Sequence, residues 1–245
     1  MTKQLLHESL SKYYDRLYSF RDYLDEAVRI QNLIIKHSPK EPNSILDVAC
    51  GTGLHLKHLS DDFSCTGVDI SKDMLKIARK NAKGVTFKQS DMKQLNLKKE
   101  FDVIICLFSS IGYLKNMSHL DKTLKNFSNH LAKDGIIFIE PSYAKSYYVS
   151  GKPSITVYDE KDAKITRINL SKTKKNTTNL SMHMLIAEKG KEPKYYIDNH
   201  KLSLFGIKDT LKSMRNAGLK CKHLPNGLMS GRELLLGKKN RKREI

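Results

Sequence analysis

Between residues 41 and 140 the chain alternates two patterns of apolar and polar positions. Short runs of consecutive apolar residues predict buried strands, and stretches with an apolar residue every three or four positions predict helices. Strands and helices that alternate in this way predict a doubly wound, mostly parallel α/β sheet. The expected elements are strand Ile45–Val48, helix Leu54–Leu59, strand Cys65–Val68, helix Ser71–Asn81, strand Val85–Lys88, strand Val103–Phe108, helix His119–Leu131 and strand Gly135–Glu140.

The pattern differs on either side of this segment. Residues 1–40 place apolar side chains at helical spacing, and Pro39 and Pro42 end that stretch. After Pro141, apolar and polar residues alternate one by one, which predicts antiparallel strands. These runs are Ile155–Tyr158, Lys164–Leu170, Leu180–Ile186 and Ile197–Phe205, with polar turns expected at Asp159–Asp162 and Ser171–Thr178. A helix at Ile207–Ala217 and strands at Cys221–Leu224 and Glu233–Leu236 are expected to follow.

We therefore predict one α/β domain with a seven-stranded, mostly parallel sheet and an antiparallel β insertion. Ligands of open α/β sheets lie at the carboxyl ends of the strands, so the insertion is expected to cover that edge as a substrate lid. The predicted parts are a helical cap at 1–40, a core at 41–140, the lid at 141–205, a C-terminal helix and strands at 206–237, and a basic tail at 238–245.

The turn after the first predicted strand carries the clearest chemical signal. Asp47 ends the strand, and Gly51 and Gly53 permit a tight turn whose backbone comes close to a ligand. Asp69 ends the next strand, where a carboxylate holds the ribose of an adenosine-containing cofactor. The third glycine of a dinucleotide fingerprint is missing. S-adenosylmethionine (SAM) has no pyrophosphate to accommodate, and its ammonium group suits the nearby carboxylate of Asp47. The alternative is a strand–turn–helix unit without a ligand.

The composition indicates the cellular location of the protein more clearly than it indicates a reaction. The 245 residues contain no apolar run of 18 residues and begin without the apolar segment of a secretory signal. Four scattered cysteines, without a paired or histidine-linked motif, indicate neither a disulfide framework nor a zinc site, and a cytoplasmic location is expected. The formal net charge of +18 fits an RNA or an anionic small substrate, and it equally fits a lysine-rich surface.

Several short motifs together resemble the class I SAM-dependent methyltransferases. Within that class the chain is most similar to the N,N-dimethyltransferases of TDP-linked amino sugars, of the desosamine and mycaminose type. The likeness covers nearly the whole chain, and the residues that carry it are Tyr14-Asp15, Tyr18, Asp47–Gly53, Asp69, Asp91-Met92, Phe108–Leu114, Ile139–Pro141, Leu202–Phe205 and Ser230–Arg232. The aminosugar likeness rests on the loops more than on the cofactor motifs. It implies a Rossmann-like fold, SAM as cofactor and N-methylation.

The resemblance also implies roles for individual residues. The Asp69 carboxylate is expected to accept from the ribose hydroxyls, and that of Asp91 from the adenine amino group. The other expected cofactor contacts are Met92 and Leu107 at the adenosine, Ala49, Gly51 and Gly53 at the methionine part, and Tyr23 closing over the cofactor. Read without the resemblance, Asp69 caps a helix at Ser71, Asp91 is a surface turn residue and Tyr23 is a core aromatic.

A sugar amine is protonated near neutral pH, so a methyltransferase that acts on it needs a proton acceptor. Tyr18 matches a substrate-pocket tyrosine, and His200 on a lid strand is the candidate acceptor. Arg167 and Arg232 are candidates for binding a nucleotide diphosphate, with ion pairs as the alternative. The related enzymes carry tryptophans after the Glu-Pro motif, whereas this chain has Tyr143 there and no tryptophan; Tyr143 or Tyr147 is the candidate replacement.

Other acceptors stay open at this stage. A different small amine or a hydroxyl compound is the main alternative substrate. RNA is less favoured, because neither the proline-rich motif of adenine-amine methyltransferases nor the Pro-Cys nucleophile of cytosine enzymes is present. A SAM-binding protein without catalysis is a third alternative. No membrane partner is expected, and the sequence leaves a homodimer open.

Overall fold

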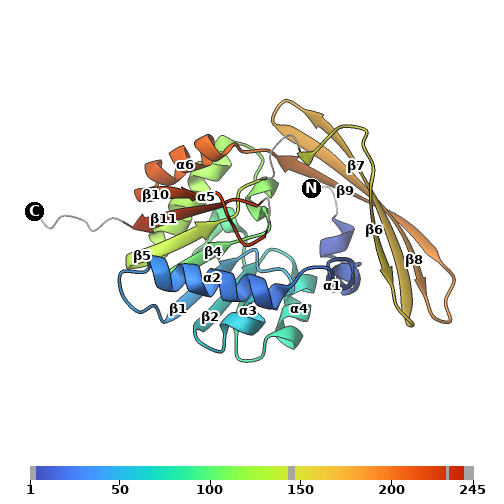
Figure 1. The fold of residues 1–245 in the computed structure, drawn as a ribbon, viewed down its shortest axis with the longest axis horizontal. Coiled ribbons are helices and arrows are strands. Elements are labelled where there is room, and N and C mark those ends of the chain that lie inside the picture. Colours follow the sequence, from blue (N-terminus) through green and yellow to red (C-terminus); the bar gives the residue numbers. More distant parts are fainter. Residues whose placement is uncertain (1–3, 143–146, 230–231, 240–245) are drawn as a thin grey trace, which may run out of the picture.

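The computed structural model describes residues 4–142, 147–229 and 232–239. Its strands form two separate β-sheets (Figure 1). The larger sheet has seven strands in the order β10-β11-β5-β4-β1-β2-β3. Its strands are β1 (Ser44–Val48), β2 (Ser64–Asp69), β3 (Thr86–Gln89), β4 (Phe101–Cys106), β5 (Leu131–Ile139), β10 (Leu219–Leu224) and β11 (Leu234–Lys239). The first five are parallel, while β11 runs antiparallel to β5 and β10 antiparallel to β11. The predicted seven-stranded, mostly parallel sheet is confirmed.

Helices cover both faces of this sheet. One face is packed by α2 (Tyr23–His37) and α3 (Leu54–Leu59), and the other by α5 (Met117–Asn129) and α6 (Ile207–Asn216). Their apolar side chains meet strands whose residues are almost all buried, which is why those strands appear in the sequence as continuous apolar runs. The remaining long helix, α4 (Lys72–Asn81), begins where the Ser71 hydroxyl accepts from Met74 N–H, as the sequence predicts.

Several predicted boundaries of strands and helices are wrong, among them the start of β5, which begins at Leu131 and not at Gly135, and two have identifiable reasons. Helix α5 begins two residues earlier than expected, because the Asn116 side chain accepts from His119 N–H and caps it. Strand β4 ends at Cys106, two residues before the predicted end, because Phe108 and Ser109 have positive φ angles of 53° and 57°. A strand cannot continue through that conformation.

The smaller sheet is the predicted antiparallel lid, with strands β6 (Ser154–Asp159), β7 (Ala163–Lys174), β8 (Thr177–Glu188) and β9 (Lys194–Ser203) in sequence order. The polar turn predicted at Ser171–Thr178 is wrong, since β7 and β8 remain paired almost to the tip and only Lys175 and Asn176 turn. The hydroxyl groups there are enclosed and hydrogen-bonded: Thr178 is fully buried, and the Thr173 hydroxyl lies 3.0 Å from that of Thr178 and 3.0 Å from the Tyr148 carbonyl.

The N-terminal cap lies between the two sheets (Figure 1). It consists of short turns rather than long helices, namely η1 (Leu5–His7), η2 (Ser11–Tyr13) and α1 (Tyr14–Leu17), and only α2 is as long as the sequence pattern predicts. Leu6, Leu10 and Leu17 pack against Ile165 and Met184 on the inner face of the lid. Two short 3-10 segments complete the elements, η3 (Met92–Gln94) and η4 (Ser110–Tyr113). Among the described helices, none has the length and apolar character needed to cross a bilayer.

Candidate functional site

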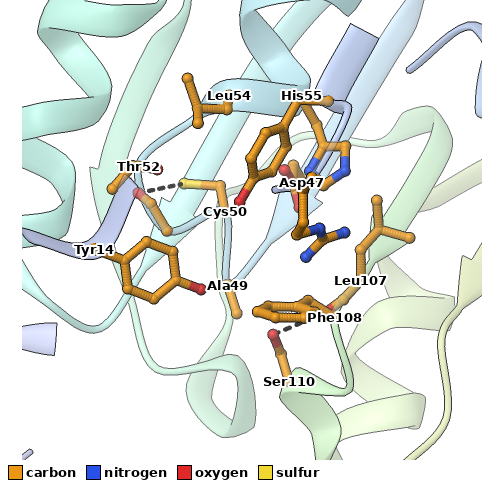
Figure 2. A pocket seen from close by; sticks show the side chains of 13 residues that line it. Tyr14, Asp47, Ala49, Cys50, Thr52, Leu54, His55, Leu107, Phe108 and Ser110 are labelled. Atoms are coloured by element: carbon orange, nitrogen blue, oxygen red, sulfur yellow. Dashed lines mark hydrogen bonds between the residues drawn. The ribbon is translucent and has the colours of Figure 1, made fainter. Parts of the chain in front are cut away.

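A pocket opens at the carboxyl ends of β1 and β4, where the N-terminal cap faces the larger sheet (Figure 2). Five predicted cofactor residues line it, namely Tyr23, Asp47, Ala49, Gly51 and Leu107. Tyr14 lines it too, and its hydroxyl points toward Ala49 in Figure 2. The sequence motif around the glycines therefore leads to the right edge of the sheet.

The turn after β1 is held open by an unusual backbone. Ala49, Gly51 and Gly53 all have positive φ angles, of 61°, 55° and 75°. A Cβ added to Gly51 would meet nothing within 4 Å, so this glycine leaves free space at the pocket. A Cβ on Gly53 would lie 3.1 Å from Ala78 Cβ and 3.3 Å from the Phe87 ring. Gly53 is thus needed for its backbone angle and for packing, and it does not line the described pocket as we expected.

Two buried carboxylates stand at the ends of β1 and β2. Asp69 accepts from Gly51 N–H through Oδ2 at 2.9 Å and from Ser71 N–H through Oδ1 at 2.8 Å, so it holds the glycine turn and the start of α4 together. Each of its oxygens keeps a further lone pair for a ligand. Burial, followed by the nearby charge of Asp69, raises the pKa of Asp47 to about 8.

Asp91 and Met92 follow β3, the strand beside β2 at the same edge of the sheet. Asp91 accepts from Lys93 N–H at 2.9 Å and pairs with the Lys93 ammonium at 3.1 Å, while Met92 is partly buried against the core. Neither residue lines the described pocket. Their adenine contacts stay a prediction.

A buried charge cluster around Glu26 of α2 was missed by the sequence reasoning. The Glu26 carboxylate accepts from Arg21 Nε at 2.9 Å and pairs with His55 Nε2 at 2.8 Å, and Arg21 and His55 both line the pocket. Burial opposes ionisation of Glu26, but the hydrogen bonds from His55 and Arg21 lower its pKa. The pocket thus holds both an acid, Asp47, and a guanidinium, that of Arg21, which is paired with Glu26. No sequence signal marks this, because it depends on which face of the helix is buried.

Three separate motifs of the chain meet at Phe108. Glu140 accepts from Phe108 N–H, and its other oxygen pairs with Arg232 at 2.5 Å. Ser109 donates to the Pro141 carbonyl at 2.6 Å and accepts from Arg232 at 3.1 Å. Two consecutive non-glycine residues with positive φ are costly, and they persist where several contacts fix them, commonly beside functional sites. Arg232 therefore makes the ion pair that was the alternative expectation, and its binding of a diphosphate stays a prediction.

The space between the pocket and the lid is lined by aromatic and cationic groups. The Tyr18 ring meets the Phe108 ring edge-on at 5.1 Å, and the Arg167 guanidinium lies 4.8 Å from the centre of the Tyr18 ring. Arg167 is only 4% exposed, and its single hydrogen bond goes from Nη2 to the Thr156 hydroxyl at 3.1 Å. Within residues 4–142, 147–229 and 232–239, no acceptor meets its Nε or Nη1 and no carboxylate pairs with it.

His200 is the centre of a chain of three polar side chains on the inner face of the lid. The Tyr113 hydroxyl lies 2.8 Å from its Nδ1, and the Asp198 carboxylate 2.9 Å from its Nε2. Asp198 also accepts from the backbone N–H groups of Leu5 and Leu6. Burial opposes ionisation of Asp198, but the hydrogen bond from His200 and these two backbone bonds lower the pKa of Asp198 below its ordinary value. An ionised Asp198 requires a proton on Nε2, which leaves Nδ1 to accept from Tyr113.

The sequence reasoning placed His200 but missed Tyr113. This tyrosine lies in the Phe108–Leu114 motif, and only the packing of the lid on η4 brings it to a histidine 87 positions later. Its side chain is 38% exposed, whereas His200 is buried. Tyr143 lies outside the described residues. Tyr147, the other candidate replacement for a tryptophan, is exposed and meets Tyr148 edge-on at 5.2 Å.

Comparison with known proteins places this site among enzymes. Residues 45–135 match a family model described as a methyltransferase domain. The chain is 35% identical to the dTDP-3-amino-3,4,6-trideoxy-alpha-D-glucopyranose N,N-dimethyltransferase of Streptomyces venezuelae, over 91% of this chain and 95% of that one. It is 34% identical to the dTDP-3-amino-3,6-dideoxy-alpha-D-glucopyranose N,N-dimethyltransferase of Streptomyces fradiae, over 89% and 85%.

Two solved structures have the same fold over nearly the whole chain. Streptomyces venezuelae DesVI superimposes with a TM-score of 0.87 at 33% identity, covering 94% of this chain and 98% of that one. The sugar N-methyltransferase KedS8 from Streptoalloteichus gives a TM-score of 0.85 at 27% identity, covering 93% of each chain.

Proposed function

The chain belongs to the SAM-dependent methyltransferase family that contains the TDP-amino-sugar N,N-dimethyltransferases, and we propose that its methyl acceptor is the amine of a nucleotide-linked amino sugar. The relatives named above act on such sugars according to their names. Three groups of this chain's residues support that acceptor: one would hold the cofactor, one would accept a proton and one would bind a diphosphate.

The pocket at β1 fits the amino-acid end of SAM. Arg21 and Asp47 offer opposite charges to a zwitterion, and Gly51 leaves free space where any other residue would place a Cβ. We assign the carboxylate of the cofactor to Arg21, its ammonium to Asp47 and its ribose to Asp69. Ala49, Tyr23 and Leu107 would line the same molecule. When bound, SAM supplies a methyl group on a positively charged sulfur, which a neutral amine can displace.

The protein must therefore deliver the acceptor amine without its extra proton. In our proposal the Tyr113 oxygen takes that proton while its own hydroxyl proton passes to His200 Nδ1 across 2.8 Å. The imidazolium that results is stabilised by Asp198, at 2.9 Å from Nε2. Although Tyr113 as a whole is 38% exposed, its hydroxyl is enclosed beside His200, and this loss of hydration raises the pKa of Tyr113 well above its ordinary value, so the tyrosine acts as a neutral relay and not as a phenolate. Tyr18, between Phe108 and Arg167, would orient the sugar.

The single observation that carries the choice of substrate is the buried Arg167. A guanidinium that is 4% exposed and has no carboxylate partner among the described residues is costly by itself. A diphosphate is a ligand that such a group binds through paired hydrogen bonds. Arg167 lies over Tyr18 on the inner face of the lid, so a bound diphosphate would hold the sugar near the relay.

The first test is methyl transfer from SAM to a TDP-linked 3-amino sugar, followed by mass spectrometry, with the same sugar lacking the nucleotide as comparison. We expect turnover on the linked sugar and much weaker activity on the unlinked one. Turnover that needs no nucleotide, or that occurs only on an RNA, would contradict the proposal. If the protein binds SAM but methylates no amino sugar, its family assignment stands and the proposed substrate class is wrong.

The proton relay has its own test. Tyr113→Phe and His200→Ala are each expected to lower kcat by about 100-fold to 10,000-fold, with SAM affinity unchanged. Because Tyr113 and His200 act in the same proton relay, the double variant should turn over only slightly more slowly than either single variant. The control is Tyr195→Phe, since Tyr195 is exposed on the opposite face of the lid. Independent, multiplying effects of the two substitutions, or wild-type rates in both, would rule out the relay.

Two further expectations remain proposals. The four cysteines are free, which fits a reducing cytoplasm. The positive net charge would speed the encounter with an anionic nucleotide sugar.

A further inference from the structure

His7 lies directly beside the proposed proton relay and takes no part in it. The centre of its ring is 5.2 Å from that of His200 and 5.5 Å from that of Tyr113, and both contacts are edge-on. The ring of Tyr14, which lines the cofactor pocket, is 6.0 Å away. His7 therefore stands between the pocket from which the methyl group would come and the groups that would take the proton of the amine.

The His7 ring presents one free acceptor. Its Nδ1 lies 3.0 Å from the side-chain oxygen of Gln4, which can only accept, so Nδ1 carries the proton and Nε2 keeps a lone pair. Across residues 4–142, 147–229 and 232–239, no group donates to Nε2. His7 as a whole is partly exposed, but burial of its ring, followed by the nearby charge of His200, lowers the pKa of His7 to about 3. His7 is thus suited to accept a hydrogen bond and not a proton.

The position of His7 is fixed from both sheets. The backbone N–H groups of Leu5 and Leu6 donate to Asp198 on the lid, at 3.0 and 2.8 Å. The His7 carbonyl accepts from the Ser71 hydroxyl at the start of α4. An acceptor held in this way discriminates between ligands, because it cannot move to another partner when a ligand lacks the matching donor.

The lid has an arginine end and a relay end. Arg167 and Ser171 lie four residues apart on β7, and His200 stands in the cross-strand row of Ser171. At ~3.4 Å per residue the two rows are ~14 Å apart along the strands. The N-terminal cap runs in the same direction, with Tyr18 at Arg167 and His7 at His200. A sugar whose diphosphate lies at Arg167 would therefore turn its far edge toward His7.

Given the proposed function, we infer that His7 Nε2 accepts from a hydroxyl on the carbon next to the amine, on the side away from the diphosphate, and that the enzyme selects amino sugars which carry this hydroxyl. For an amine on the third carbon of the sugar, the hydroxyl is that of the fourth carbon, because the second carbon lies toward the diphosphate. A sugar without it would take water from Nε2 and supply no donor in return, which weakens its binding.

Two nucleotide-linked sugars isolate this hydroxyl. TDP-3-amino-3,6-dideoxyglucose carries it, and TDP-3-amino-3,4,6-trideoxyglucose lacks it. The measurement is kcat/KM for each sugar at saturating SAM. We expect the wild type to favour the hydroxylated sugar ~10-fold to 100-fold. His7→Phe keeps an aromatic ring and removes the acceptor, so the preference should disappear, while the SAM affinity measured by calorimetry should not change.

His183→Phe is the matched control. His183 stands in the row of the exposed Ile168 and Ile197 on the outer face of the lid, so the variant should keep the wild-type preference. If His7→Phe does not fold, His7→Leu removes the same acceptor with a smaller side chain.

The outcomes separate this inference from the proposed function. Equal kcat/KM of the wild type for the two sugars would overturn the inference and leave the proposed function standing. Equal losses on both sugars in His7→Phe would also overturn it, since that pattern belongs to a structural residue or to a base for the amine. Turnover of neither sugar by the wild type would contradict the proposed function, and the inference with it.

Discussion

The two sheets build their parts of the site in different ways. At the edge of the larger sheet the glycine turn is shaped by backbone geometry. Ala49, Gly51 and Gly53 have positive φ angles, and the Asp69 carboxylate accepts from two backbone N–H groups. On the lid side the site is made of side chains from separate elements: Asp198 and His200 lie two positions apart on β9, and Tyr113 comes from η4. The first arrangement is local in the chain, and the second is not.

This difference separates the part of the site that binds the cofactor from the part that selects the acceptor. A backbone cradle tolerates few changes of residue, because each position needs a particular φ angle or a missing Cβ. A set of side chains on a sheet face can be exchanged one at a time while the strands stay paired. We therefore expect variants at the larger sheet to affect the cofactor and variants at the lid to affect the acceptor.

The largest effect is expected from Asp69→Ala. The substitution removes the proposed partner of the ribose and the acceptor of Gly51 N–H, and charge-assisted hydrogen bonds of ~1.5–3 kcal/mol each convert to a loss of SAM affinity of ~100-fold or more. Calorimetric titration with SAM measures it. The control is Asp73→Ala, an exposed acid in the first turn of α4. Equal SAM affinity in Asp69→Ala and the wild type would show that the cofactor does not use this edge.

Arg167→Met is expected to have two smaller effects of opposite sign, a gain in stability and a loss of affinity for the acceptor. Removing a buried cation without a carboxylate partner should raise the free energy of unfolding by ~1–3 kcal/mol. It should also raise KM for the nucleotide-linked sugar ~10-fold to 100-fold, because charged hydrogen bonds to the diphosphate are lost. SAM affinity should not change.

Denaturant unfolding and steady-state kinetics measure the two effects separately. Arg29→Met is the control, since Arg29 is exposed and paired with Asp25 on α2. A variant that is less stable than the wild type, or that loses the linked and unlinked sugars equally, would argue that Arg167 is a structural residue.

The smallest effect concerns pH. Asp47 has a pKa raised to about 8, so its carboxyl is mostly protonated at pH 7, and an ammonium group favours the ionised form. SAM or S-adenosylhomocysteine should thus bind more tightly as the pH rises from 7 to 9, by ~10-fold at most. Asp47→Asn should remove the part of the dependence that belongs to this residue.

The unliganded protein should respond in the opposite direction. A carboxyl whose folded-state pKa lies above its ordinary value of 3.8 contributes stability at low pH, and that contribution is lost as the pH rises through about 8. Asp47→Asn should flatten this decline as well. Parallel pH profiles of affinity in wild type and variant would mean that Asp47 is not near the ammonium.

Sequence reasoning found the larger sheet because its signals are local. The apolar run of β1, the glycines of the turn and Ser71 at the start of α4 each act within a few residues, and the structure has them as expected. It failed where a distant contact decides the local structure. The end of β4 is set by Glu140, Pro141 and Arg232, which hold Phe108 and Ser109 in positive φ.

The same reason explains the residues that were missed at the site. Arg21, which precedes α2, lines the pocket where Glu26 of α2 holds its guanidinium and also pairs with His55 of α3, and nothing in the helical pattern indicates this. Tyr113 has a functional neighbour only after the lid folds over η4. Single residues of the lid, such as His200 and Arg167, could be chosen as candidates, but Tyr113 and Tyr18 reach them only when the lid packs on η4 and on the N-terminal cap.

The register of the four lid strands restricts how a chain of this kind can diverge. Along β7, Arg167 is buried on the inner face of the lid and its neighbour Ile168 is exposed on the outer face, and along β9 the same holds for Asp198 and Ile197. One inserted or deleted residue within either strand would turn every side chain beyond it to the opposite face. Descendants of this enzyme can therefore gain new acceptors by substitution, or grow longer at the Lys175–Asn176 turn, but the strands themselves must keep their length.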